Sequence, residues 1–176
     1  PKENIVGEPA KRETAAAMLL GAMIARRKDP KAVVINQASD HILVDHKEFI
    51  HVVETAAQVA ESGVSIVTVG ISPTFPHIGF GYIKIDDEVS RVNRLPVFKV
   101  ENFTEKPNQA TAKAFISTGK YFWNANMYVW KADALITAFE RYSPSILSVL
   151  APIEAAVGTS EFQDVLTKAY ENVEKI

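Results

Sequence analysis

The chain has 176 residues, of which 47% are hydrophobic and 23% are charged, and its net charge is −2 at pH 7. This composition is ordinary for a globular domain with its own core, and the weak negative charge gives no indication of binding to nucleic acid or to an anionic membrane surface. The chain has no cysteine, which excludes disulfides, thiolate zinc sites and cysteine nucleophiles and is compatible with the cytoplasm, and no apolar run reaches the roughly 18 to 20 residues of a membrane span.

The first part of the chain alternates between predicted strands and helices. Apolar and β-branched runs predict strands at residues 5–6, 32–35 and 64–71, and the last two are expected to be buried on both faces. Helices are predicted over residues 14–27 and 45–62. This alternation predicts an α/β layered fold with a mixed, largely parallel sheet.

The second of these helices carries clear end signals. Asp45 is typical of an N-cap, and Glu48 follows three positions later, as in a capping box. Gly63 is expected directly after the end of the helix, where glycine is common.

The middle of the chain has the pattern of an antiparallel hairpin. A strand is predicted to begin within residues 79–85, residues 86–88 are polar and predict the turn, and residues 97–103 return. A helix over 108–117 and a strand over 126–130 follow.

The end of the chain is predicted to be helical. One helix is expected over residues 132–142, and the pattern from 144 to 172 is helical with breaks at Pro152 and Gly158.

Asp40 is a candidate ligand of a hard cation. It follows the strand that ends near Ile35, and ligands in open α/β sheets bind beyond the carboxyl ends of strands. Magnesium usually takes one or two carboxylates and keeps water and phosphate oxygens as its other ligands. The alternative is an ordinary loop or cap carboxylate, and His41 beside it is expected to pack or to form a local hydrogen bond.

Glu105 and Lys106 suggest a site for a phosphorylated sugar. A glutamate accepts hydrogen bonds from vicinal hydroxyls, and a lysine neutralises a phosphate as a point charge. The alternative is a surface ion pair that closes a strand before Pro107.

Glu8, Arg12 and Thr14 surround a loop before the first helix. A carboxylate only accepts hydrogen bonds, so Glu8 suits the two adjacent donors on the pairing edge of guanine. Arg12 suits a phosphate, and Thr14 suits the helix N-cap. Ordinary loop residues are the alternative.

Five segments in this order resemble the mannose-1-phosphate guanylyltransferases, a branch of the sugar nucleotidylyltransferases. The family patterns are E-P-x-x-R-N-T-A, P-[AS]-D-H, G-Y-G-Y-I, F-x-E-K-P and W-N-[SA]-G-M. The matching segments here begin at Glu8, Ala38, Gly79, Phe103 and Trp123.

The resemblance implies a Rossmann-like, GT-A-like nucleotidyltransferase fold and the reaction of GTP with mannose 1-phosphate to give GDP-mannose and pyrophosphate. By motif position, Glu8, Arg12 and Thr14 would bind the nucleotide, and Asp40 would hold Mg²⁺. Gly81, Glu105, Lys106 and Asn124 would bind the sugar phosphate, with Asp40 and Lys106 as the catalytic pair.

The chain departs from the family pattern at several positions. Glu13 stands in place of asparagine, Ala38 in place of proline, and His77-Ile78 in place of Glu-Thr. Asn126 replaces a glycine beside the sugar, which adds a side chain there and bears on which hexose fits.

The family's glycine-rich triphosphate loop and its second metal carboxylate have no counterpart in this chain. We therefore expect a single partial nucleotidyltransferase domain over residues 1–176, incomplete at both ends. The alternatives are another sugar-1-phosphate nucleotidylyltransferase, such as one for glucose 1-phosphate, and a non-catalytic sugar-phosphate-binding paralogue. Homo-oligomers are possible, and neither nucleic acid nor a membrane is expected as a partner.

Overall fold

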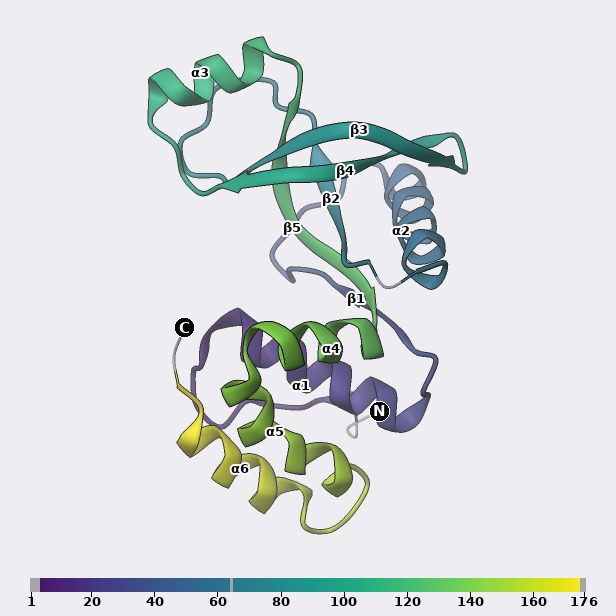
Figure 1. Cartoon of the computed structure of the whole chain (residues 1–176), viewed down its shortest axis with the longest axis vertical. Coiled ribbons are helices and arrows are strands. Elements are labelled where there is room, and N and C mark those ends of the chain that lie inside the picture. Colours follow the sequence, from purple (N-terminus) through teal and green to yellow (C-terminus); the bar gives the residue numbers. More distant parts are fainter. Residues whose placement is uncertain (1–3, 64, 175–176) are drawn as a thin grey trace. The chain divides into compact units, whose positions relative to one another are not determined.

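The computed structural model describes residues 4–63 and 65–174. The chain divides into two compact units (Figure 1). Unit 1 consists of Pro1–Val34 and Trp130–Ile176, and unit 2 consists of Ile35–Val129.

Unit 1 is built from helices. They are α1 (Glu13–Lys28), α4 (Ala132–Tyr142), α5 (Pro144–Ala156) and α6 (Phe162–Asn172). Each helix buries apolar side chains spaced three or four residues apart, which places them on one face. The largest fully buried side chains here are Leu19, Met23, Trp130, Leu150, Ile153, Leu166 and Tyr170.

Unit 2 is organised around strands. It contains α2 (His46–Glu61), β2 (Val67–Ile71), β3 (Tyr82–Val92), β4 (Leu95–Thr104) and α3 (Gln109–Ser117). Figure 1 shows β3 and β4 as a long hairpin that crosses β2 and β5, with α3 and α2 toward its opposite ends. Tyr82, Ala112 and Trp123 form a buried cluster, to which α3 contributes Ala112.

Two further strands cross the boundary between the units, β1 (Val33–Asn36) and β5 (Tyr121–Lys131). Among the described residues the strands form one five-stranded sheet with the order β1-β5-β3-β4, and β2 also pairs with β5.

The prediction of a largely parallel sheet was wrong. The pairs β2–β5, β3–β4 and β3–β5 are all antiparallel. The alternation of strand and helix that suggested a parallel sheet is interrupted after β2, where β3 and β4 follow each other as a hairpin. The expected burial on both faces was wrong as well, since Ile35 and Ile71 are 44% and 50% exposed.

The predicted helix ends are confirmed where a side chain caps the backbone. Asp45 Oδ1 accepts a hydrogen bond of 3.0 Å from the backbone N–H of Glu48, and Asn108 caps α3 in the same way through Thr111. Gly63 follows the C-cap Ser62 as expected. Val64, the predicted first residue of β2, lies outside the described residues.

Three local predictions were wrong. Ile5 and Val6 form no strand. Residues 86–88 lie inside β3, and the hairpin turns at Asn93 and Arg94, whose φ values of +48° and +71° suit a tight two-residue turn. Pro152 lies inside α5 rather than ending a helix, whereas the break at Gly158 is confirmed.

None of the helices in the described parts of the chain combines the length and the apolar character needed to cross a membrane.

Candidate functional site

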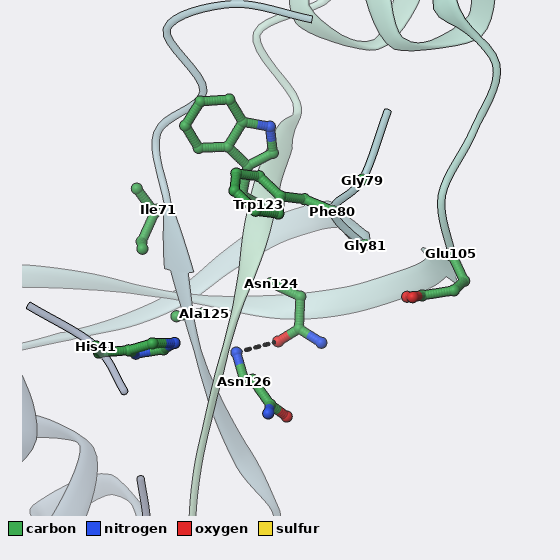
Figure 2. A pocket seen from close by; sticks show the side chains of 10 residues that line it. All are labelled: His41, Ile71, Gly79, Phe80, Gly81, Glu105, Trp123, Asn124, Ala125 and Asn126. Atoms are coloured by element: carbon green, nitrogen blue, oxygen red, sulfur yellow. Dashed lines mark hydrogen bonds between the residues drawn. The ribbon is translucent and has the colours of Figure 1, made fainter. Parts of the chain in front are cut away.

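A cavity of about 390 Å³ opens in unit 2 beside β5 and the end of β2, next to the segment that precedes β3 and the residue that follows β4. Figure 2 shows its lining side chains. They are His41, Ile71, Gly79, Phe80, Gly81, Glu105, Trp123, Asn124, Ala125 and Asn126. The cavity therefore brings together three of the residues that the sequence predicts for sugar binding, namely Gly81, Glu105 and Asn124.

Gly81 lies close to both Asn124 and Glu105. Its carbonyl accepts a hydrogen bond of 2.8 Å from the backbone N–H of Asn124. A Cβ at this position would lie 2.7 Å from Oε2 of Glu105, which is closer than van der Waals contact allows. Only glycine lets the Glu105 carboxylate approach the strand at this point.

The side-chain amide of Asn124 is held on both sides. Its Oδ1 accepts a hydrogen bond of 3.0 Å from the backbone N–H of Asn126, as drawn in Figure 2. Its Nδ2 donates a hydrogen bond of 2.9 Å to the hydroxyl of Tyr128. The amide therefore faces the cavity in a defined orientation.

Lys106 lies next to the cavity but does not line it. Its side chain is 65% exposed, and Nζ lies 3.4 Å from Oε1 of Glu105. The pair follows the end of β4 at Thr104, so the surface ion pair that was the alternative to a sugar-phosphate site does form. An exposed pair of this kind contributes little to stability, which leaves the lysine free to turn toward an anion.

Asp40 is exposed in a turn after β1 and lies outside the cavity lining, although His41 beside it belongs to that lining. His41 Nδ1 lies 3.0 Å from Nε2 of Gln37, which confirms the expected local hydrogen bond. In the parts of the chain described, no group of three or more histidine and carboxylate side chains gathers to hold a metal. A single carboxylate fits Mg²⁺ that is also held by phosphate oxygens and water, but it does not form a protein cage by itself.

Aromatic rings form the apolar wall of the cavity. Phe80 and Trp123 meet edge to face with ring centroids 5.3 Å apart, and Phe75 packs against Trp123 at 5.2 Å. His77 stacks on Phe80 at 3.9 Å, and its Nδ1 accepts a hydrogen bond from the N–H of Gly79. Aromatic rings of this size usually pack in the core, but Phe75 is 52% exposed.

The cavity thus has one apolar side and one polar side. In Figure 2, Phe80 and Trp123 lie on one side, and His41, Asn124 and Asn126 lie on the other. A pyranose has the same division, with C–H groups on its faces and hydroxyls around its rim. The aromatic rings of the lining can contact the C–H groups, and its carboxylate and amides can bind the hydroxyls.

Glu8 lines a second cavity, of about 300 Å³, in unit 1. Its other lining residues are Asn4, Val6, Ala17, Leu20, Gly21 and Ile24, most of them on α1. The cavity is apolar apart from Asn4 and the carboxylate. This arrangement suits a planar ring that presents donors on one edge.

The neighbours of Glu8 have structural roles. Arg12 Nε donates a hydrogen bond of 2.9 Å to the carbonyl of Tyr170, in the last turn of α6, where a cation is favourable. Thr14 lies inside α1 and does not cap it, because the N-cap is Arg12. Burial raises the pKa of the Tyr170 phenol well above its usual range, and the negative charge of Glu8 raises it further.

The chain belongs to the nucleotidyl transferase family, whose model matches residues 1–165. Among its relatives, mannose-1-phosphate guanylyltransferase of Escherichia coli K12 is 36% identical over 88% of this chain. The protein ManC of Salmonella typhimurium, with the same name, is 37% identical over 83% of this chain. The aligned regions cover 33% and 31% of these relatives, so the chain spans about a third of their length.

Solved structures support the same fold. A protein of Thermus thermophilus, described as a mannose-1-phosphate geranyltransferase, superposes with a TM-score of 0.82 at 29% identity over 97% of this chain and 47% of its own. A mannose-6-phosphate isomerase of Helicobacter pylori has a TM-score of 0.73 at 23% identity over 96% of this chain and 62% of its own, which shows a common fold only.

Proposed function

We propose that this chain is part of an enzyme that transfers a guanylyl group from GTP to mannose 1-phosphate, giving GDP-mannose and pyrophosphate. The proposal is supported by membership of the nucleotidyl transferase family and by the names of the relatives. One observation carries it: Gly81, Glu105 and Asn124 come from different segments of the chain and line one cavity that also has an aromatic wall.

In the proposed reaction, a phosphate oxygen of the sugar phosphate attacks the α-phosphorus of GTP, and the bond to the β-phosphate oxygen breaks. Both partners are anions, so the protein must hold them in line and offset their repulsion. We assign the sugar hydroxyls to Glu105 and Asn124 and the sugar phosphate to Lys106. Lys106 needs only a side-chain rotation for this role, because its ion pair with Glu105 is exposed.

Asp40 is the residue that we assign to Mg²⁺, together with oxygens of the nucleotide. When bound, the cation would neutralise charge on the phosphates. The exposure of Asp40 suits a site that is completed by phosphate and water.

We assign the nucleotide to the second cavity, in unit 1. The apolar lining suits the guanine ring, and the Glu8 carboxylate suits its two adjacent donors. Arg12 already binds the end of α6 through Nε and Nη2, so its third guanidinium nitrogen, Nη1, would take its part in the nucleotide loop.

Asn126 bears on which hexose the cavity accepts. Its side chain lies at the polar side of the cavity, as Figure 2 shows, where the family pattern has glycine. Extra volume and an extra amide at this position favour a second candidate, a guanylyltransferase or related enzyme for another hexose 1-phosphate such as glucose 1-phosphate.

The test is turnover by the intact protein with Mg²⁺ and a panel of substrates. GTP, UTP and ATP are each combined with mannose 1-phosphate and with glucose 1-phosphate, and pyrophosphate is measured. We expect GTP with mannose 1-phosphate to be fastest.

A preference for GTP with glucose 1-phosphate would support the second candidate. Binding of a hexose 1-phosphate without release of pyrophosphate from any pair would favour the non-catalytic paralogue. A preference for UTP would remove Glu8 from the guanine-reading role.

A further inference from the structure

Strand β5 is irregular beside the cavity. Gly70 of β2 lies opposite Asn124, and Thr68 lies opposite Tyr128, so β2 advances two residues while β5 advances four. Asn126 lies at the middle of this irregularity and has a φ of +52°. This segment is a bulge, with more residues on β5 than on its partner.

The bulge shortens β5 between Asn124 and Tyr128. In a regular strand, residues four apart are separated by about 13 Å along the strand, which is too far for the two side chains to form a hydrogen bond. Here Nδ2 of Asn124 and the hydroxyl oxygen of Tyr128 are 2.9 Å apart. Tyr128 is half-buried and does not line the cavity.

The two hydrogen bonds determine which way the Asn124 amide faces. The backbone N–H of Asn126 can only donate, so Oδ1 must face it. Nδ2 then faces Tyr128, and the phenol oxygen accepts its hydrogen. Without the phenol, only the contact with Asn126 would hold the amide.

We propose that Tyr128 is a positioning residue for sugar recognition, which rests on the proposed function of the cavity. An asparagine side chain has two N–H donors and an oxygen with two lone pairs. Tyr128 accepts one of the N–H groups of Asn124, and the backbone N–H of Asn126 uses one lone pair of its oxygen. One N–H and one lone pair of Asn124 are therefore left for the ligand. A sugar hydroxyl both accepts and donates, and this fixed pair matches it.

The first test is the kinetics of the intact protein carrying Tyr128→Phe. This variant keeps the ring and removes the hydroxyl, and its KM for the hexose 1-phosphate is expected to rise about threefold to tenfold, the value of one ordinary hydrogen bond. The KM for the nucleotide is expected to stay unchanged. In an Asn124→Ala background, Tyr128→Phe is expected to have no further effect.

Tyr121→Phe is the matched control. Tyr121 lies on the same strand, is also half-buried and stacks on Phe115 at 3.9 Å, and no hydrogen bond of its hydroxyl occurs among the described residues. The proposal is overturned if the two variants behave alike, or if Tyr128→Phe raises both KM values and lowers the melting temperature, as a merely structural role requires.

The second test is the ¹⁵N spectrum of the Asn124 side chain without ligand, assigned by its loss in Asn124→Ala. Tyr128→Phe is expected to shift these amide signals, and Tyr121→Phe is not. Unchanged signals in Tyr128→Phe overturn the proposal. If the wild type binds no hexose 1-phosphate, the proposed function fails, while this spectrum still decides whether Tyr128 holds Asn124.

Discussion

Asn126 and Lys106 share a backbone conformation that residues other than glycine rarely adopt. Their φ values are +52° and +43°. Asparagine tolerates this left-handed conformation better than most residues, whereas lysine does not. Asn126 lines the cavity, and Lys106 follows the lining residue Glu105. Strained positions of this kind persist where the surroundings impose them, often at functional sites, which supports the assignment of this cavity.

Gly81→Ala is expected to weaken sugar binding without unfolding the protein. The added methyl would collide with Oε2 of Glu105 at 2.7 Å, but this atom ends a flexible side chain that is 69% exposed and can move away. Displacement of the Glu105 carboxylate takes a charged hydrogen-bond acceptor away from the sugar, which should lower the affinity for a hexose 1-phosphate by about tenfold or more. The free energy of unfolding should change by less than about 0.5 kcal/mol. Calorimetry and urea denaturation measure the two effects.

Gly63→Ala is the control for this substitution. A Cβ at Gly63 has no atom closer than 3.9 Å, and its backbone does not require the left-handed region. We expect neither affinity nor stability to change. An unchanged affinity in Gly81→Ala would remove Glu105 from the sugar site.

At the scale of elements, local signals predicted the helices better than the strands. The side chains of Asp45 and Asn108 each accept a hydrogen bond from the backbone N–H three residues later in the chain. Both partners of this interaction therefore lie within one short segment of sequence. The extent of β3 depends instead on pairing with β4. Asp86, Asp87 and Glu88 look like a turn by composition, but β3 continues through them as an exposed strand.

The sequence predicted only those residues of the site that belong to a recognisable motif. The segments around Gly81, Glu105 and Asn124 resemble family patterns, and these residues do line one cavity. Ile71 and Tyr128 carry no such pattern. The hydrogen bond between Tyr128 and Asn124 depends on the bulge in β5. The bulge depends in turn on how β2 pairs with β5, which no local sequence motif indicates.

Arg26 joins three helices of unit 1. It lies on α1 and binds Glu154 of α5, with Nε 2.7 Å from Oε1, and Asp133 of α4 at 2.9 Å. The Glu154 side chain is only 20% exposed. Removal of the guanidinium would leave that carboxylate partly buried without its partner.

Arg26→Met is therefore expected to lower the free energy of unfolding by about 1 to 3 kcal/mol. Arg26→Lys should recover only part of this loss, because an ammonium cannot bind a carboxylate through two parallel N–H groups. Urea denaturation of the intact protein measures both.

Arg91→Met serves as the comparison for the Arg26 variants. Arg91 is 60% exposed and pairs with Glu88 three residues away on the same strand. The loss of this surface pair should cost less than about 0.5 kcal/mol. Equal losses in Arg26→Met and Arg91→Met would mean that the three-helix ion pairs contribute no more than a surface pair.

At the scale of the whole molecule, the candidate residues divide between the two units. Glu8 lines the cavity of unit 1, and Glu105 and Asn124 line the cavity of unit 2. The chain spans about a third of its relatives' length. Any activity is therefore a property to be measured on the intact protein rather than on one unit.

The dependence of stability on pH has an identifiable source in unit 1. The Tyr170 side chain is fully buried, and its hydroxyl has no hydrogen-bond partner among the described residues. Burial, followed by the charge of Glu8, raises the pKa of this phenol in the folded state. Above about pH 10 the unfolded chain loses the phenol proton while the folded chain keeps it, so folding becomes less favourable as pH rises.

Tyr170→Phe is expected to weaken this alkaline loss of stability. At neutral pH the variant should be as stable as the wild type or more stable by up to about 1 kcal/mol, because it removes a buried hydroxyl that makes no hydrogen bond to any residue the structure describes. Tyr142→Phe is the control, since the Tyr142 side chain is 73% exposed. Urea denaturation between about pH 9 and pH 11 compares the three proteins. A Tyr170→Phe curve parallel to that of the wild type would show that the lysines and the other phenols, rather than Tyr170, set the alkaline limit of the fold.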